Sequence, residues 1–175
     1  MEAILALDSN NGLSKQGIIP WKSDKDLKFF YETTKNNVVI MGRNTYLSLP
    51  DNARPLKNRL NVILTNHAKL FENESNKNTI FTDNLSIYND ILQNREKYCG
   101  LYPSLSRNFK IFIIGGKQIY EHFIPLCEVV WITRIKNCYS CDLTIDINLD
   151  NRFREKEYYE DDEIKISTFE KGGAK

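Results

Sequence analysis

The chain has 175 residues, of which 41% are hydrophobic and 27% charged, and its 24 basic and 23 acidic side chains leave a net charge of +1. This length and apolar share predict one folded domain rather than a disordered chain. The balanced charge disfavours a protein that binds nucleic acid, and because no apolar run approaches the roughly 18–20 residues that span a bilayer, we expect no membrane segment. The N-terminus lacks the pattern of a secretory signal, and with four cysteines this favours a reducing, cytoplasmic setting.

The first three quarters of the chain alternate short apolar runs with amphipathic stretches. Continuous apolar runs are typical of strands buried on both faces, and apolar spacings of three and four residues are typical of helices. Strands are predicted at 3–7, 38–41, 60–65, 79–82, 110–114 and 129–135. Helices are predicted at 23–34, 44–49, 85–98 and 117–123, with a glycine-containing loop at 12–20.

The end of the chain has a different pattern, because the predicted strands at 143–147, 153–159 and 164–169 have no helix between them. Alternating strands and helices predict a parallel sheet, and hairpin-like strands predict an antiparallel edge on that sheet. We therefore expect a single α/β domain over residues 1–171 and a frayed tail at 172–175. In such sheets ligands bind outside the carboxyl ends of the strands.

Two glycine turns follow predicted strands and begin predicted helices, at 42–45 and 115–118. Glycine lets a ligand approach the backbone, and the free N–H groups of a helix start attract phosphate. The side chain of Arg43 adds a permanent positive charge. Any strand-to-helix turn can contain glycine, but two such turns in one sheet favour an extended anionic ligand. Neither turn matches the dinucleotide fingerprint or the P-loop.

Asp26 has two interpretations. Ser23 lies three residues before it, so the carboxylate is either a solvent-exposed member of a helix capping box or part of a site. Leu27 and Phe30 lie near it on the same predicted helix. A carboxylate beside apolar side chains loses hydration, which raises its pKa and suits it to bind an amidine-like heterocycle.

The segment 54–59 contains Arg54, Lys57 and Arg59. It is either a solvated basic turn or a clamp for an anionic tail, in which Arg59 forks onto a carboxylate. The pair Cys138 and Cys141 has no second pair near it, and both histidines are isolated. We therefore interpret these cysteines as structural and predict no metal site.

Seven short motifs occur together in this order and spacing: Ile4-Leu5-Ala6, Gly12 to Trp21, Asp26-Leu27 with Phe30, Val39 to Thr45, Arg54 to Arg59, Ile114-Gly115-Gly116 with Tyr120, and Trp131 to Ile135. Over nearly the whole chain this set resembles dihydrofolate reductase. The resemblance implies an eight-stranded, mostly parallel sheet with an antiparallel C-terminal strand and about four helices. It also implies hydride transfer from NADPH to 7,8-dihydrofolate, a reaction that supports one-carbon metabolism and thymidylate synthesis.

By this resemblance Asp26 hydrogen-bonds the pterin and assists protonation of its imine nitrogen, Thr133 supports that network, and Trp21 lies at the base of a mobile loop; these are the expected catalytic residues. Arg59 would pair with the α-carboxylate of the glutamyl tail. The expected substrate contacts are Ile4, Leu5, Ala6, Asp26, Leu27, Phe30, Leu49, Leu56, Arg59, Ile114, Tyr120 and Thr133.

The same resemblance places the cofactor between the two glycine turns and under the loop 12–19. Its expected contacts are Ala6, Gly12, Gly17, Ile18, Gly42, Arg43, Asn44, Thr45, Leu64, Thr65, Asn66, Ile114, Gly115, Gly116, Lys117, Gln118, Ile119 and Tyr120. The expected partners are dihydrofolate and antifolate inhibitors, with no nucleic acid and no membrane, and the expected form is a monomer.

Three positions depart from the common pattern of the family. Lys117 replaces a small residue, Leu143 replaces a frequent threonine, and Asn44 and Asn66 leave Arg43 as the clearest cation for a 2′-phosphate. Two alternatives remain at this stage: a related reductase acting on another pteridine or a riboflavin-pathway pyrimidine, and a non-catalytic nucleotide-binding module. Arg59 and Phe30 favour a folate, and the pairing of Asp26 with Thr133 favours an enzyme.

Overall fold

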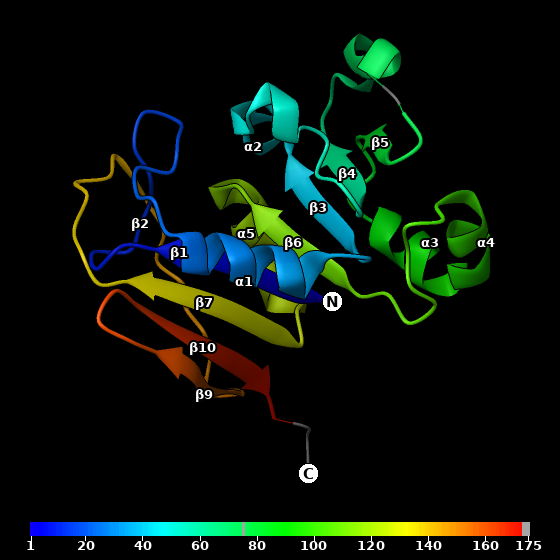
Figure 1. Cartoon of the computed structure of the whole chain (residues 1–175). Coiled ribbons are helices and arrows are strands. Elements are labelled where there is room, and N and C mark those ends of the chain that lie inside the picture. The colour runs from blue at the N-terminus through cyan, green and yellow to red at the C-terminus, as the bar shows by residue number, and fades with distance from the viewer. Residues whose placement is uncertain (75, 173–175) are drawn as a thin grey trace.

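The computed structural model describes residues 1–74 and 76–172. Its centre is an eight-stranded sheet with the order β5-β4-β3-β6-β1-β7-β10-β9 (Figure 1). The strands are β1 (Glu2–Leu7), β3 (Val38–Gly42), β4 (Leu60–Leu64), β5 (Thr79–Thr82), β6 (Ile111–Gly115), β7 (Val129–Ile135), β9 (Phe153–Glu160) and β10 (Ile164–Lys171). Pairings from β5 to β7 are parallel, whereas β10 is antiparallel to both of its neighbours. The predicted fold class is confirmed.

The helices follow the predicted order with one exception. They are α1 (Asp24–Thr34), α2 (Arg43–Ser48), α3 (Ile87–Gln93), α4 (Arg95–Leu101) and α5 (Lys117–Phe123), with short 3-10 turns at Asp51–Ala53, Ala68–Glu74 and Ile124–Leu126. The single helix predicted at 85–98 is wrong, because the chain breaks at Asn94. The Asn94 side-chain amide donates to the carbonyl of Asp90 at 3.1 Å, and such local bonds compete with a continuous helix.

The strand predicted at 143–147 is also wrong in extent and in place. Only Leu143–Thr144 forms a strand, β8, and it pairs with β2 (Gly12–Ser14) in a separate two-stranded sheet. Within the predicted strand 143–147, Leu143, Thr144 and Asp146 are exposed. Ile145 is buried there and Ile147 is partly exposed. One buried side chain does not hold a strand in the large sheet. The predicted loop 12–20 therefore contains a strand that the sequence did not indicate.

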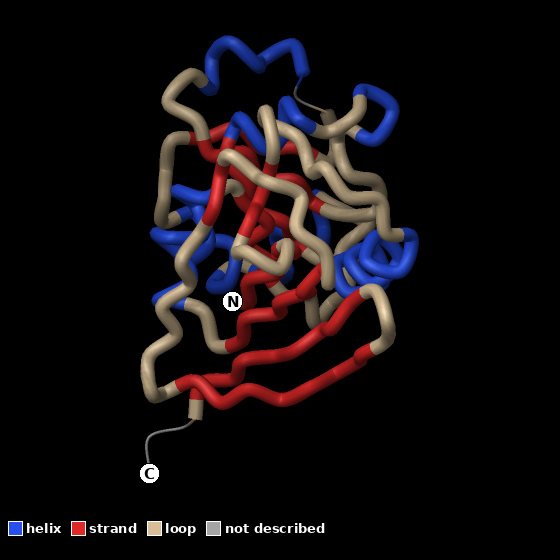
Figure 2. Tube along the Cα trace, turned by 90° about the vertical axis from the view of Figure 1, so that its left-hand side faces the viewer, coloured by secondary structure: helices blue, strands red, loops and turns tan. Residues whose placement is uncertain are grey.

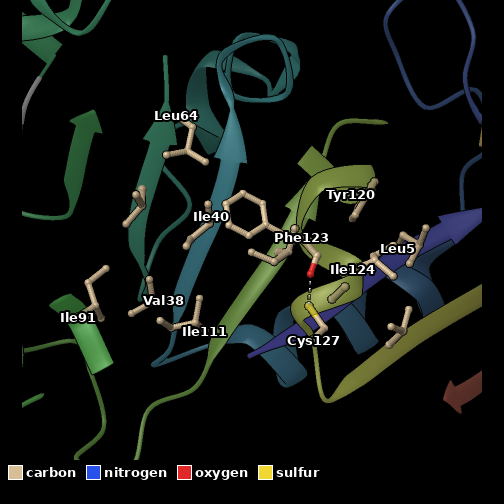
Figure 3. Close-up of a cluster of buried hydrophobic side chains, with 14 of the residues drawn as sticks. Leu5, Val38, Ile40, Leu64, Ile91, Ile111, Tyr120, Phe123, Ile124 and Cys127 are labelled. Carbon is tan, nitrogen blue, oxygen red and sulfur yellow. Dashed lines mark hydrogen bonds between the residues drawn. The ribbon is translucent and has the colours of Figure 1, made fainter. Parts of the chain in front are cut away.

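The two faces of the sheet bury different side chains. On one face, alternate residues of the central strands pack against α3, α4 and α5. They include Leu5, Val38, Ile40 and Ile111 (Figure 3). Their chain neighbours Ile4, Val39 and Phe112 belong to a second cluster with Tyr46 of α2 and the partly buried Phe29 and Phe30 of α1. Each buried strand thus contributes to both layers, as continuous apolar runs predict.

The C-terminal strands β10 and β9 form one edge of the sheet, where Ile164 and Ile166 are buried and Tyr158 packs on Phe29 of α1. Figure 2 shows them as the lower edge of the molecule, with the helices higher up beside the other strands. β9 is exposed along almost its whole length and carries alternating charges, which discourages pairing with another sheet edge. Among the described residues, no helix has the length and hydropathy needed to cross a membrane.

Candidate active site

Parallel pairing brings the carboxyl ends of six strands, β5, β4, β3, β6, β1 and β7, to one edge of the sheet. In register, Ala6 of β1 lies beside Thr133 of β7, and Met41 of β3 lies beside Gly115 of β6. The beginning of α1 lies at the same side, next to the turn that contains β2 (Figure 1). This edge therefore gathers the side chains of the predicted site from segments that are far apart in the sequence.

Asp26 is held at this edge by the start of α1. Ser23 is the N-cap, and its hydroxyl oxygen accepts a hydrogen bond from the backbone N–H of Asp26 at 3.2 Å. The predicted helix cap is confirmed, but it engages only the backbone of Asp26. The carboxylate itself accepts a hydrogen bond from the hydroxyl of Thr133, which is 2% exposed. The two interpretations of Asp26 thus apply to different atoms of the same residue.

Burial gives the Asp26 carboxylate an unusual proton affinity. Loss of hydration raises its pKa, and the hydrogen bond from Thr133 offsets only part of that rise. Behind it, the Tyr120 hydroxyl donates to the carbonyl of Ile4 at 2.9 Å. Burial and the nearby charge of Asp26 raise the pKa of Tyr120, so this phenol stays neutral. The site therefore combines one carboxylic acid of raised pKa with a neutral phenol behind it.

Apolar side chains surround the site on the α1 side of the sheet. Ile4 and Leu56 are buried there, and Phe30, Leu49 and Ile114 pack against them while remaining partly exposed. Leu27 is 64% exposed on α1 and so is open to a ligand at its surface. Leu5 is the exception: its side chain is buried in the cluster with α5 on the opposite face (Figure 3). The prediction that Leu5 lines this pocket is wrong, because adjacent residues of a strand point to opposite faces.

Arg59 is the most buried cation near this pocket, at 5% exposure. Its Nε donates to the carbonyl of Lys57 at 2.9 Å and one terminal nitrogen donates to the Thr34 hydroxyl at 3.1 Å. The guanidinium lies 5.7 Å from the ring centre of Phe30 and 5.3 Å from that of Tyr31. Within the described residues it forms no ion pair, and burial lowers its pKa. A desolvated arginine held in this way has strong affinity for a carboxylate.

The two glycine turns meet at the ends of β3 and β6. A Cβ atom on Gly42 would lie 3.1 Å from Ile119, and one on Gly116 would lie 3.2 Å from the Thr45 hydroxyl. Gly115 has a φ of +119° and joins Gly116 through a cis peptide bond. These positions thus keep the backbone bare where α2 and α5 begin. That arrangement fits the phosphate groups of a nucleotide, with Arg43 beside the first turn.

The remaining residues predicted to bind the cofactor spread along the same edge. Leu64 and Thr65 are buried at the end of β4, whereas Asn44, Asn66 and Gln118 are exposed and Arg43 and Lys117 are half-buried. Lys117 lies 3.9 Å from Glu121, one turn further along α5. Its side chain is therefore directed along the helix by a weak pair and does not fill the turn.

The segment 12–19 forms a short ribbon over this edge. Lys15 and Ile18 exchange backbone hydrogen bonds of 2.8 and 3.2 Å, and the Gln16 N–H donates to the Asp142 carboxylate at 3.0 Å. Ile18 and Ile19 are each 61% exposed. Gly17 has a φ of +79°, and a Cβ on Gly12 would collide with Cys141 at 2.6 Å. The glycine at 12 is thus required by packing at the base of the ribbon.

Two buried groups anchor that base. Trp21 is 6% exposed and packs with Ile135, Ile164 and Ile166. The fully buried Asp8 accepts backbone hydrogen bonds from Gly12 at 2.7 Å and from Tyr139 at 3.0 Å. Burial raises the pKa of Asp8, but these donors outweigh burial and leave it below the ordinary value. The roles of Asp8 and Asp142 were not predicted; the only signal was that Asp8 directly follows a buried strand.

The fold and site together define a small α/β enzyme with a half-buried acid, Asp26, at the carboxyl edge of its sheet. The family model for dihydrofolate reductase matches residues 1–170. The chain belongs to the dihydrofolate reductase family, and it is an oxidoreductase by that membership.

Individual relatives have similar levels of identity. A dihydrofolate reductase of Ureaplasma parvum is 33% identical, over 81% of this chain and 79% of that protein. A dihydrofolate reductase of Drosophila melanogaster is 31% identical, over 98% and 91% respectively. A bifunctional dihydrofolate reductase-thymidylate synthase of Zea mays is 36% identical over 82% of this chain, which spans 28% of the length of that longer protein.

Proposed function

We propose that this chain reduces 7,8-dihydrofolate to 5,6,7,8-tetrahydrofolate with NADPH as the reductant. The observation that carries the proposal is the half-buried Asp26 carboxylate, which is desolvated and hydrogen-bonded by Thr133 between α1 and the sheet. Its raised pKa suits a proton donor, since a general acid works best when its pKa lies near the working pH. Membership of the family supports the same reaction.

Different side chains of the site have different roles in binding and reducing dihydrofolate. Asp26 binds the amino and ring nitrogens of the pterin and holds the proton that reaches the imine nitrogen, by way of a water molecule. Ile4, Phe30, Leu49 and Leu56 cover the ring system, and Arg59 binds the α-carboxylate of the glutamyl tail. A pteridine or pyrimidine without such a tail would leave the Arg59 charge buried without a partner, which favours a folate over the other reductase substrates.

The cofactor fits the two glycine turns. We assign Arg43, Thr45 and the backbone around Gly115 and Gly116 to its phosphates, and Ala6 and Ile18 to its nicotinamide end, where the bound group supplies a hydride. Closure of the ribbon 12–19 would exclude water from the reacting atoms. The preference for NADPH depends mainly on Arg43, and the monomeric state and cytoplasmic location remain predictions.

The test follows NADPH oxidation by absorbance with purified protein and dihydrofolate. We expect turnover that requires both substrates, is inhibited by an antifolate, and is slower with NADH. The matched control is Asp24→Asn, which alters an exposed carboxylate two residues from Asp26 on the same helix start. Absence of turnover at high enzyme concentration would refute the proposal, and activity of Asp26→Asn equal to that of Asp24→Asn would refute the role of Asp26.

A further inference from the structure

A cavity of about 290 Å³ lies on the face of the sheet opposite the candidate active site. Leu7 and Ile132 line it, and both belong to the buried cluster with α5 rather than to the cluster with α1 and α2. In register, Leu7 lies beside Arg134, one position after the pair of Ala6 and Thr133. Because adjacent residues of a strand point to opposite faces, this rear cavity lies directly behind those two residues of the site.

The lining of the rear cavity combines an apolar floor with a few polar side chains. The apolar residues are Leu7, Ile132, Ile147, Leu149 and Phe169, and the polar residues are Asn11, Arg134, Asp146 and Asn148. The first two apolar side chains are buried, whereas the other three are only partly buried and offer apolar surface to a ligand. A concave apolar surface with a small number of polar groups is the usual form of a site for a small molecule.

Arg134 and Asp146 bring opposite charges to this cavity. One terminal nitrogen of the half-buried Arg134 donates to the Asn11 side-chain oxygen at 2.6 Å and to the Asp8 carbonyl at 3.2 Å, and both acceptors are neutral. Asp146 is exposed. Within residues 1–74 and 76–172 neither side chain forms an ion pair. The rear cavity therefore presents one cation and one anion that the described part of the chain does not neutralise.

The chemistry of the lining selects a ligand that carries both charges on an apolar body. A carboxylate matches the planar fork of Arg134, and an ammonium group matches the Asp146 carboxylate. An α-amino acid has both groups on one carbon atom, and a large apolar side chain would cover Leu149 and Phe169. A ligand with only one charge would leave the opposite charge of the cavity without a partner.

We propose that the rear cavity binds an α-amino acid with a large apolar side chain. This assignment goes beyond the proposed function, because it concerns a separate site on the other face of the sheet. Arg134 binds the carboxylate, Asp146 binds the ammonium group, and the partly buried apolar residues hold the side chain.

The rear cavity also touches the segments that support the ribbon 12–19. Asn11 directly precedes β2, and its carbonyl accepts a hydrogen bond from the Ile145 N–H at 3.0 Å, just after β8. A ligand between Arg134 and Asp146 would therefore fasten the residues after β8 to those before β2. Because a ligand shifts an equilibrium toward the state that it binds better, the bound amino acid should stabilise the β2–β8 pairing.

An NMR titration of the protein with L-phenylalanine tests the site. We expect a Kd of about 1 mM, a range that ligands of this size reach, and shifts of the amides of Asn11, Arg134 and 145–149. 3-Phenylpropionate, which lacks the ammonium group, should bind about 2- to 5-fold more weakly, as expected for one exposed ion pair. Phenethylamine, which lacks the carboxylate, should bind about 10-fold more weakly or worse. Equal affinity for all three, or shifts only at the candidate active site, would overturn the assignment.

Two variants separate the charge from the cavity. Asp146→Asn should weaken binding of L-phenylalanine by about 2- to 5-fold and leave 3-phenylpropionate unchanged. Leu149→Trp should fill the cavity and abolish binding of both. The matched control is Asp162→Asn, an exposed carboxylate between β9 and β10 that does not line the cavity. L-Phenylalanine affinity that is unchanged in Asp146→Asn, or retained in a folded Leu149→Trp, would contradict the proposal.

Hydrogen exchange of peptides covering 12–20 tests the link to the ribbon. Saturating L-phenylalanine should slow this exchange in the wild type and have no effect in Leu149→Trp. Binding without any change in exchange would overturn the link. Neither readout depends on turnover, so a negative result here leaves the proposed function intact, and failure to reduce dihydrofolate would leave the rear cavity unaffected.

Discussion

Asp26 has opposing influences on its proton, and the balance between them determines what it can do. Burial between α1 and β7 favours the neutral acid, whereas the Thr133 hydroxyl favours the carboxylate. A raised pKa means that a protonated fraction persists at a pH where an exposed aspartate has none. This balance is what the proposed role of Asp26 in binding the pterin and supplying a proton requires.

Asp26→Asn should lower the rate of hydride transfer to dihydrofolate at neutral pH by about 100-fold or more, because a general acid contributes at least that much. The wild-type rate should fall as the pH rises through the raised pKa of Asp26, and the variant should lack that fall. Stopped-flow measurement across pH checks both.

Thr133→Val should move the fall in the hydride-transfer rate to higher pH than in the wild type, because it removes the hydrogen bond that lowers the pKa of Asp26. A shift to lower pH would contradict this account.

Arg59→Ala should weaken dihydrofolate binding by about 10- to 100-fold, the loss of a hydrogen-bonded charge pair. NADPH affinity should change little, since the polar and ring interactions of Arg59 in the described part of the chain are with Thr34, Lys57, Phe30 and Tyr31. Fluorescence titration with each ligand gives both constants. Equal losses for the two ligands would indicate a general loosening of α1 rather than loss of a tail clamp.

The ribbon 12–19 depends on a neighbouring element for its position. Beyond the bonds of Gly12 with Asp8 at its base, its backbone is held by the Lys15–Ile18 bridge, the β2–β8 pairing and the Gln16 N–H bond to Asp142. Such short pairings open easily, which suits a segment that must admit and release ligands. The site thus places a weakly held ribbon on a base fixed by Trp21 and Asp8.

Asp142→Ala should speed hydrogen exchange at the Gln16 amide by about 10-fold, because one hydrogen bond to a charged acceptor is lost. Exchange in β3 and β6 should stay unchanged. Asp146→Ala is the control, since that exposed carboxylate lies four residues further along the same segment. Mass spectrometry of peptides covering 12–20 measures the effect. Equal exchange in the two variants would show that Asp142 does not hold the ribbon.

Strands that are buried on both faces could be predicted from the sequence. Elements whose ends or pairing depend on one local hydrogen bond could not. The runs 38–41 and 60–65 are apolar throughout, so they indicated β3 and β4 directly. The helix predicted at 85–98 keeps its apolar spacing through Asn94, whereas the structure breaks there, with non-helical backbone angles and a side-chain bond to Asp90 at Asn94. Likewise, β8 consists of exposed residues whose pairing with β2 leaves no apolar pattern.

The topology of the whole molecule determines which distant residues come into contact. Local sequence patterns did not predict these contacts. Asp26, Arg59 and the glycine turns were recognisable because their motifs occur in a known order. The bonds from Tyr120 to Ile4 and from Gln16 to Asp142 join residues 116 and 126 positions apart. The face to which Leu5 points also follows only from strand register. The sequence therefore indicated the candidate site residues better than the hydrogen bonds and packing that hold them in place.

The partly buried carboxylate of Asp26 also lowers the stability of the folded protein at neutral pH, and this effect depends on pH in a definite direction. The folded state raises the pKa of Asp26 above its unfolded value of about 3.9. Folding is therefore favoured by this group below the unfolded pKa, and that contribution is lost as the pH rises through the folded pKa. At neutral pH the ionised carboxylate remains in a poorly hydrated place, which weakens the folded state in exchange for a usable proton.

Asp26→Asn should accordingly melt at a higher temperature than the wild type at about pH 7, because the amide carries no charge to desolvate. Each 1 kcal/mol gained corresponds to about 2–4 °C in a domain of this size. The difference should shrink as the pH is lowered toward about 3, where the wild-type carboxyl is mostly protonated in both states. Calorimetry across this range, with the exposed Asp24→Asn as control, measures the effect. A variant less stable than the wild type at neutral pH would show that ionised Asp26 stabilises the fold. That result would contradict the raised pKa on which its role as proton donor depends.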